Sequence, residues 1–152
     1  MFSWQERTWT CGPAALRIAL RLLKIRKTEQ HLARLLKTNK IRGTANKNFI
    51  KVAKYYKLAY ITKSKSSIKE LSRLSKEGYK IIVCYFSVIN NSAHFAVVKK
   101  ITSKHIYLLD PSLGPRLRYK KNYFVKTWVS QRDKDKRWFI ALKKKKATFK
   151  TP

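Results

Sequence analysis

The order of two hydrophobic periodicities along the chain restricts its fold more than any other feature. The first third has helical spacing, with apolar residues at i, i+3, i+4, i+7 and i+8 in its first segment: Ala15, Ile18, Ala19, Leu22 and Leu23. Later segments are β-branched and aromatic and predict strands at residues 58–61, 80–87, 93–101, 105–109, 116–119 and 138–142. Helices followed by antiparallel strands are typical of an α+β domain.

Capping residues indicate where further helices begin and end. Thr28 is expected to cap a second helix and Thr44 a third, each ahead of an apolar stripe. Ser67 and Glu70 form a capping-box pattern for a fourth helix, which Gly78 should end. An aromatic segment containing Tyr123, Phe124 and Trp128 is expected to pack under the sheet.

Size and charge suggest one highly basic domain. The chain has 152 residues, and 37 basic against 7 acidic residues give a net charge of +30. We expect residues 1–142 to form the domain and residues 143–152 a basic, disordered tail. Nucleic acid and anionic membrane surfaces are then nonspecific electrostatic partners. The alternative is a lysine-rich composition spread over a solvated surface, because lysines occur in every segment.

No targeting or membrane-spanning segment is evident in the sequence. The longest apolar runs fall short of the roughly 18 residues of a membrane span, and no apolar signal segment follows Met1. We therefore expect a cytoplasmic protein that can lie against the inner face of the membrane. In this reducing setting a cysteine stays free to react.

The two cysteines lie in contrasting surroundings. Cys84 falls inside the apolar run 81–86, where cysteine acts as a small buried residue. Cys11 is followed by Gly12 and Pro13 at the start of the first helix. Unpaired amides at a helix N-terminus favour a thiolate, the form that attacks carbonyls. Cys11 is therefore the candidate nucleophile.

Three other residues are candidates for chemistry beside Cys11. His94 opens a strand after the turn 90–92, and Asp110 ends the next strand, so a hairpin would bring both to one edge of the sheet. Taken alone, His94 could be a structural histidine and Asp110 a turn-forming aspartate. Gln5, six residues before Cys11, could be a surface glutamine.

Four features in order give the sequence its family resemblance: Gln5, the block 11–16, His94 with the apolar residues 95–98, and Asp110 with residues 111–114. With Gly43-Thr44 and Trp128, they resemble the bacteriocin-processing cysteine peptidases over residues 2–142. That family is the papain-like domain that cuts double-glycine leader peptides in peptide exporters.

The resemblance implies a papain-like fold and a role for each candidate residue. Cys11 would be the nucleophile, His94 its base and Asp110 the group that orients the imidazole. Gln5 and the Cys11 amide would stabilise the oxyanion. The implied substrate is a leader peptide with small residues at the cut, of the Gly-Gly or Gly-Ala type.

The sequence departs from many exporter-linked members in two ways. Thr10 stands where they carry aspartate, and no ATP-binding or membrane module follows residue 142. We therefore expect a stand-alone, monomeric member that works with a separate ABC exporter. Two alternatives remain, a peptide-binding module without turnover and a nucleic-acid-binding protein.

No cofactor or metal is expected. His31 and His105 have no spacing that pairs them with a cysteine as metal ligands, and the sequence has no glycine-rich phosphate loop.

Overall fold

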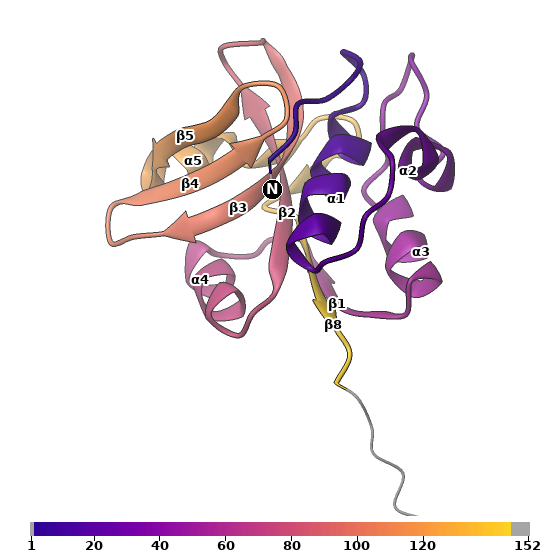
Figure 1. Ribbon diagram of the computed structural model, residues 1–152. Coiled ribbons are helices and arrows are strands. Elements are labelled where there is room, and N and C mark those ends of the chain that lie inside the picture. Colours follow the sequence, from indigo (N-terminus) through magenta and orange to yellow (C-terminus); the bar gives the residue numbers. More distant parts are fainter. Residues whose placement is uncertain (1, 147–152) are drawn as a thin grey trace, which may run out of the picture.

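A six-stranded antiparallel sheet with helices on both faces forms the frame of the molecule. The computed structural model describes residues 2–146 (Figure 1). The sheet order is β1-β8-β2-β3-β4-β5, and a separate hairpin pairs β6 with β7. The helices are α1 (Cys11–Leu22), α2 (Glu29–Leu35), α3 (Asn48–Tyr55), α4 (Ile68–Lys76) and α5 (Lys121–Thr127). The strands are β1 (Leu58–Lys63), β2 (Lys80–Ser87), β3 (Ser92–Ile101), β4 (His105–Asp110), β5 (Gly114–Lys120), β6 (Val129–Ser130), β7 (Asp135–Lys136) and β8 (Phe139–Lys144).

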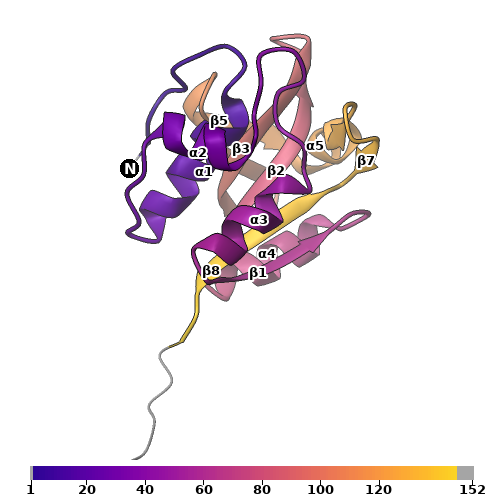
Figure 2. The ribbon, with the colours of Figure 1, turned by 90° about the vertical axis from the view of Figure 1, so that its right-hand side faces the viewer.

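Two hydrophobic clusters occupy the two faces of the sheet. In β2, Ile82 and Cys84 point to the cluster shared with α1, α2 and α3, and the alternate residues Val83 and Tyr85 point to the cluster shared with α4 and α5. Figure 2 shows α3 lying across β1 and β8. Burying one such apolar side chain contributes about 1.5–3 kcal/mol. The sheet is thereby fixed between α1 on one face and α5 on the other.

Most of the predicted boundaries are correct for local reasons. The Thr28 side chain accepts a hydrogen bond from the His31 amide at 3.1 Å, and Ser67 accepts from the Glu70 amide at 3.2 Å. Gly78 has φ +92° two residues after α4, a conformation that glycine adopts without strain. The aromatic segment forms α5, whose Phe124 is fully buried. The predicted α+β architecture is confirmed.

Thr44 does not cap the third helix, so that prediction is wrong. Helix α3 begins four residues later at Asn48, and its N-cap Lys47 makes no side-chain cap. Thr44 is instead buried, and its hydroxyl lies 2.7 Å from that of Thr38. Its neighbour Gly43 has φ +66° and accepts and donates backbone bonds with Asn39. This connection turns inward and brings Thr44 against α1.

The last strand runs two residues further than predicted. Lys143 and Lys144 belong to β8, where they pair with Ala59 and Leu58 of β1. The Lys143 ammonium also donates to the Glu77 carbonyl at 2.6 Å. The first two lysines of the expected tail are therefore part of the sheet, and residues 147–152 of that tail lie outside the described residues.

Candidate active site

His94 and Asp110 form a buried pair at one edge of the sheet. His94 is the third residue of β3 and Asp110 the last of the neighbouring strand β4. His94 Nδ1 lies 3.5 Å from Asp110 Oδ1, a separation longer than that of a usual hydrogen bond. Asp110 is fully buried and His94 is 6% exposed. The antiparallel hairpin thus brings together two residues that are sixteen positions apart, as the sequence predicts.

Asp110 is held by three hydrogen-bond donors as well as by its strand. The Tyr85 hydroxyl donates to Asp110 Oδ2, and the amides of Ser112 and Leu113 donate to Oδ1 at 2.8 and 3.0 Å. Burial alone would raise the pKa of Asp110, but hydrogen bonds from His94 and Tyr85 hold it below its ordinary value. Asp110 therefore stays ionised while buried, and it closes a turn as well as facing the imidazole.

Asn90 contacts the opposite side of the imidazole. Its Nδ2 lies 3.2 Å from His94 Nε2 and also donates to Ser112 Oγ at 3.1 Å. Asn90 thus bridges the β2–β3 turn, the histidine and the loop after Asp110. The ring is held from both nitrogens, by Asp110 on one side and by Asn90 on the other.

Cys11 begins α1, the helix that packs against β3 and β4. The thiol lies against the backbone amide of Phe95, the residue after His94, and is close enough to Asp110 to feel its charge. Cys11 is partly buried as a residue, and burial is the largest effect on the pKa of its thiol. The thiol at the start of α1 therefore lies near β3 and β4, the two strands that carry the imidazole and the carboxylate.

The pKa of the Cys11 thiol is not lowered, as its position at a helix N-terminus alone would predict. Burial raises the pKa of Cys11 to about 11, although the amides of Phe95, Gly12 and Cys11 itself lower it. The helix amides therefore act in the predicted direction but are outweighed. The raised pKa favours the thiol over the thiolate, so attack on a carbonyl needs a base to take the proton.

Gln5 lies in the segment that leads into Cys11 and is joined to the loop after Asp110. Its backbone amide donates to the Pro111 carbonyl at 3.0 Å. Its side-chain Nε2 donates to the Arg7 carbonyl at 2.8 Å, while its Oε1 is buried without a partner. The Gln5 side chain is therefore held by its own loop.

Two contacts of the site have no clear signal in the sequence. Tyr85 lies in the apolar run of β2, where alternation assigns it to the core and its hydroxyl partner cannot be predicted. Asn90 belongs to a turn, which explains an asparagine without any further role. Their link to His94 and Asp110 depends on the pairing of β2 with β3, which only the fold reveals.

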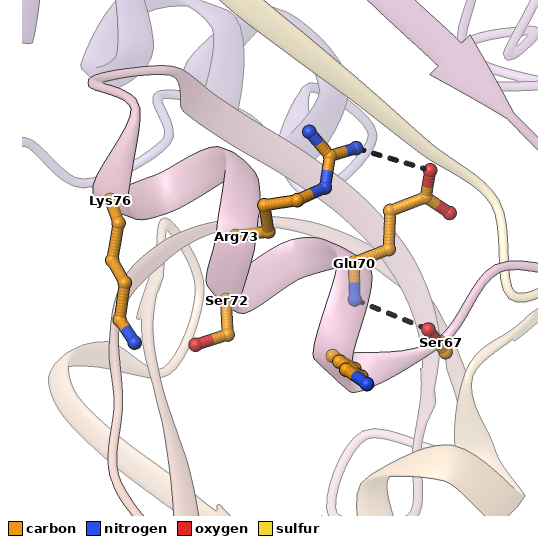
Figure 3. A pocket seen from close by; sticks show the side chains of 6 residues that line it. Ser67, Glu70, Ser72, Arg73 and Lys76 are labelled. Carbon is orange, nitrogen blue, oxygen red and sulfur yellow. Dashed lines mark hydrogen bonds and ion pairs between the residues drawn. The ribbon is translucent and has the colours of Figure 1, made fainter.

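A hollow on the exposed side of α4 is unrelated to this site. Figure 3 shows Glu70 and Arg73 facing each other there, with the Glu70 amide bonded to Ser67. Helix α4 packs on the cluster opposite to that of α1. Within residues 2–146, no group of three or more His, Cys, Asp or Glu is arranged to hold a metal ion. None of the described helices has the length and apolar character needed to cross a membrane.

Comparison with known proteins identifies relatives of the whole domain. The sequence model of the peptidase C39 family matches residues 2–146. An uncharacterised protein of Methanothermobacter thermautotrophicus is 32% identical over 125 residues, which cover 82% of this chain and 80% of that protein. These matches agree with the family that the sequence motifs resemble.

Solved structures show the same fold. The peptidase domain of Streptococcus ComA, a bi-functional ABC transporter of a quorum-sensing pathway, has a TM-score of 0.76 at 23% identity, covering 94% of this chain and 97% of that one. A double-glycine-motif protease from an AMS/PCAT transporter, crystallised with the leader peptide, has a TM-score of 0.72 at 21% identity, covering 95% and 91%. The predicted fold of helices packed on a C-terminal antiparallel sheet is therefore that of these peptidase domains.

Proposed function

Because this chain belongs to the peptidase C39 family, we propose that it is a cysteine endopeptidase in which Cys11 attacks the scissile carbonyl. The observation that carries the proposal is the buried His94–Asp110 pair next to the Phe95 amide against which the Cys11 sulfur lies. Nucleophilic catalysis needs a thiol, a base beside it and a group that orients the base. All three come from one chain, so a monomer suffices.

In the proposed first step, the Cys11 sulfur forms a bond to the carbonyl carbon while His94 takes the thiol proton. Because burial raises the pKa of Cys11 to about 11, this proton transfer is required for attack at neutral pH. Asp110, ionised and hydrogen-bonded, stabilises the imidazolium that forms. The negative charge moves to the carbonyl oxygen, where the Cys11 amide and the Gln5 side chain donate.

The second half of the reaction returns the enzyme to its starting state. The intermediate collapses as His94 gives its proton to the leaving amine, which leaves a thioester on Cys11. His94 then takes a proton from water, and the resulting hydroxide displaces the sulfur. The thiol recovers the proton, and the acid product leaves. For Gln5 to take part, its Nε2 must exchange the Arg7 carbonyl for the oxyanion.

We propose that the substrate is a leader peptide cut after small residues, of the Gly-Gly or Gly-Ala type. Support comes from the similar protease of an AMS/PCAT transporter that was crystallised with its leader peptide. A separate ABC exporter is the proposed partner, by analogy with the transporter that contains the ComA peptidase domain.

The test is incubation with a synthetic leader peptide that contains a Gly-Gly site, followed by mass spectrometry of the products. We expect one cut after the second glycine by the native protein and by the control variant Cys84→Ala. Cys11→Ala should leave the peptide intact, and leucine in place of the second glycine should block cleavage. Binding of the peptide without cleavage by the native protein would replace the peptidase assignment with that of a binding module.

A further inference from the structure

The loop between Gln5 and Cys11 is anchored at one buried carboxylate, that of Glu29. Glu29 is the first residue of α2 and is 2% exposed. Its Oε2 accepts two hydrogen bonds from the loop, from the Glu6 amide at 2.8 Å and from the Thr10 hydroxyl at 2.9 Å. One oxygen of α2 thus holds the residue after Gln5 and the residue before Cys11.

The same loop is closed internally and tied to the sheet on its other side. The Arg7 amide donates to the Thr10 hydroxyl at 3.1 Å, which makes a compact turn of residues 7–10. The Gln5 amide donates to the Pro111 carbonyl, whereas the next amide, that of Glu6, donates to Glu29. Gln5 is therefore placed at the point where the chain crosses from the loop after Asp110 to α2.

The loop also contributes to the electrostatics of Glu29. Burial raises the pKa of Glu29 above its ordinary value, and the hydrogen bonds from the Glu6 amide and the Thr10 hydroxyl oppose this effect. Nearby, Arg17 of α1 lies 3.5 Å from the Glu6 carboxylate. Glu29 is one of only seven acidic residues in a chain with 37 basic residues. A carboxylate that is buried in this way needs its donors, and the donors that it has belong to the loop.

We propose that Glu29 is a positioning residue for the oxyanion hole, holding the Gln5–Thr10 loop so that the Gln5 side chain and the Cys11 amide face the same oxygen. This inference rests on the proposed peptidase function. Glu29 does not touch substrate and acts through Glu6 and Thr10. A loss of its acceptor should weaken the transition state and leave the Cys11 sulfur as reactive as before.

A matched pair of variants separates the acceptor from the side-chain volume. Glu29→Gln keeps an acceptor oxygen, whereas Glu29→Met has a similar length and no acceptor. Gln30→Met, at the exposed neighbouring position, controls for the effect of methionine on the helix. Thermal unfolding of each variant identifies any that fail to fold.

Two reagents then report on different properties of the site. A peptide ending in a Gly-Gly aldehyde adds to Cys11: a C–S bond forms, the C=O π bond breaks and the thiol proton passes to the former carbonyl oxygen. This oxygen occupies the position of the oxyanion and accepts hydrogen bonds from the same donors, so the affinity of the aldehyde reports on them. Iodoacetamide alkylates the sulfur by displacing iodide and forms no oxyanion. Leader cleavage gives kcat and KM for the same proteins.

The expected result is a selective loss in Glu29→Met. Its kcat and aldehyde affinity should fall about tenfold to 100-fold, with KM and the iodoacetamide rate nearly unchanged. Glu29→Gln should stay within about threefold of the native protein because the bonds survive with a weaker acceptor. The proposal would be overturned if Glu29→Met bound the aldehyde as tightly as the native protein does. It would also be overturned if Glu29→Gln lost as much aldehyde affinity as Glu29→Met, or if the iodoacetamide rate of Glu29→Met fell in parallel with its kcat.

Hydrogen exchange distinguishes a failure of this inference from a failure of the peptidase function. If the native protein neither cleaves the leader nor binds the aldehyde, the peptidase proposal fails by itself. The anchoring of the Gln5–Thr10 loop by Glu29 is then tested by hydrogen exchange of the Glu6 amide, which should be faster in Glu29→Met than in Glu29→Gln. Equal exchange rates in the two variants would show that Glu29 does not anchor the loop, whatever the enzymatic result.

Discussion

Asp110 accounts for most of the geometry of the candidate site. It is fully buried, and its two oxygens accept from Tyr85 on one side and from the loop amides of Ser112 and Leu113 on the other. An ionised carboxylate in such a place is stable only while these donors remain. The position of the carboxylate beside His94 therefore depends on the Tyr85 hydroxyl and on two backbone amides.

Removing the Tyr85 hydroxyl should raise the pH at which the protein loses activity and unfolds in acid. The pKa of Asp110 lies below its ordinary value, so its contribution to stability is complete above that value and is lost as the pH falls through the lowered pKa. Tyr85→Phe removes one of the bonds that lower this pKa, so both the acid limb of kcat/KM and acid unfolding should move to higher pH. We expect a loss of about 1–3 kcal/mol in the free energy of unfolding at neutral pH.

The control for this variant is Tyr107→Phe, whose hydroxyl lies on β4 away from Asp110. Urea unfolding and pH–rate profiles of the two variants provide the measurement. Identical acid limbs in Tyr85→Phe and the native protein would show that the Tyr85 bond does not control Asp110.

The two cysteines should differ strongly in alkylation. Cys84 is 2% exposed in the core, where burial raises the pKa of its thiol above its usual range, whereas Cys11 is partly exposed. Iodoacetamide should modify only Cys11 in the folded protein, at a rate that rises up to about pH 11, the pKa of its thiol. Peptide mapping over a pH series measures this, and a rate already constant from pH 6 would contradict the neutral thiol.

The candidate residues could be found from the sequence, but their supporting contacts could not. Cys11 precedes Gly-Pro at a helix start, and a predicted hairpin places His94 and Asp110 at one edge of the sheet, but the roles of these two residues followed from the family resemblance. Tyr85 and Asn90 reach the same pair through strand pairing, which no local pattern specifies. The pKa of Cys11 was also beyond local reasoning, because burial in the folded chain is the largest effect on it.

Helix α1 approaches the α2–α3 connection so closely that Gly12 is required. A Cβ at Gly12 would lie 2.3 Å from Thr44 Oγ1 and 2.7 Å from Thr44 Cβ. Periodicity predicted all of the main helices and strands because each is amphipathic or apolar over its length. The capping pattern wrongly predicted that Thr44 begins the third helix, because its contacts with Gly12 and Thr38 override its tendency to cap a helix.

Gly12→Ala should therefore destabilise the protein although alanine favours helices. Overpacking against Thr44 should lower the free energy of unfolding by about 1–3 kcal/mol. Thr44→Gly removes the atoms that the new methyl group meets, so the same Gly12 substitution should cost much less in that background. Urea unfolding of the four proteins in this cycle is the measurement, and an equal cost in both backgrounds would rule out the contact.

The acidic residues of this very basic protein mostly hold loops together. Asp133 accepts from the Asn46 amide and Asp135 from the Asn46 side chain and Ser64, so the β6–β7 hairpin is joined to the start of the α3 region. Glu29 and Asp110 have equivalent roles near Cys11. Because the chain has 37 basic residues and only seven acidic ones, repulsion among its positive charges should destabilise the folded state.

Added salt should stabilise the protein as a result. Raising NaCl from about 20 to about 500 mM screens charges beyond a few ångströms, so the thermal midpoint should rise. Replacing the exposed lysines Lys51, Lys54 and Lys99 by glutamate should reduce this dependence. Nonspecific retention on heparin should weaken over the same range. A thermal midpoint that falls as salt is added, or a salt dependence of the midpoint that is unchanged in the variant, would show that charge repulsion does not limit the stability of the protein.

The decisive observation is the covalent intermediate itself. The leader peptide is mixed with excess enzyme and quenched in acid within the first turnover, and intact mass spectrometry is followed by peptide mapping. We expect a transient species heavier by the acyl part of the leader, attached at Cys11, absent in Cys11→Ala and much reduced in His94→Ala. Cleavage that proceeds without this thioester, or in the absence of the Cys11 sulfur, would contradict this expectation.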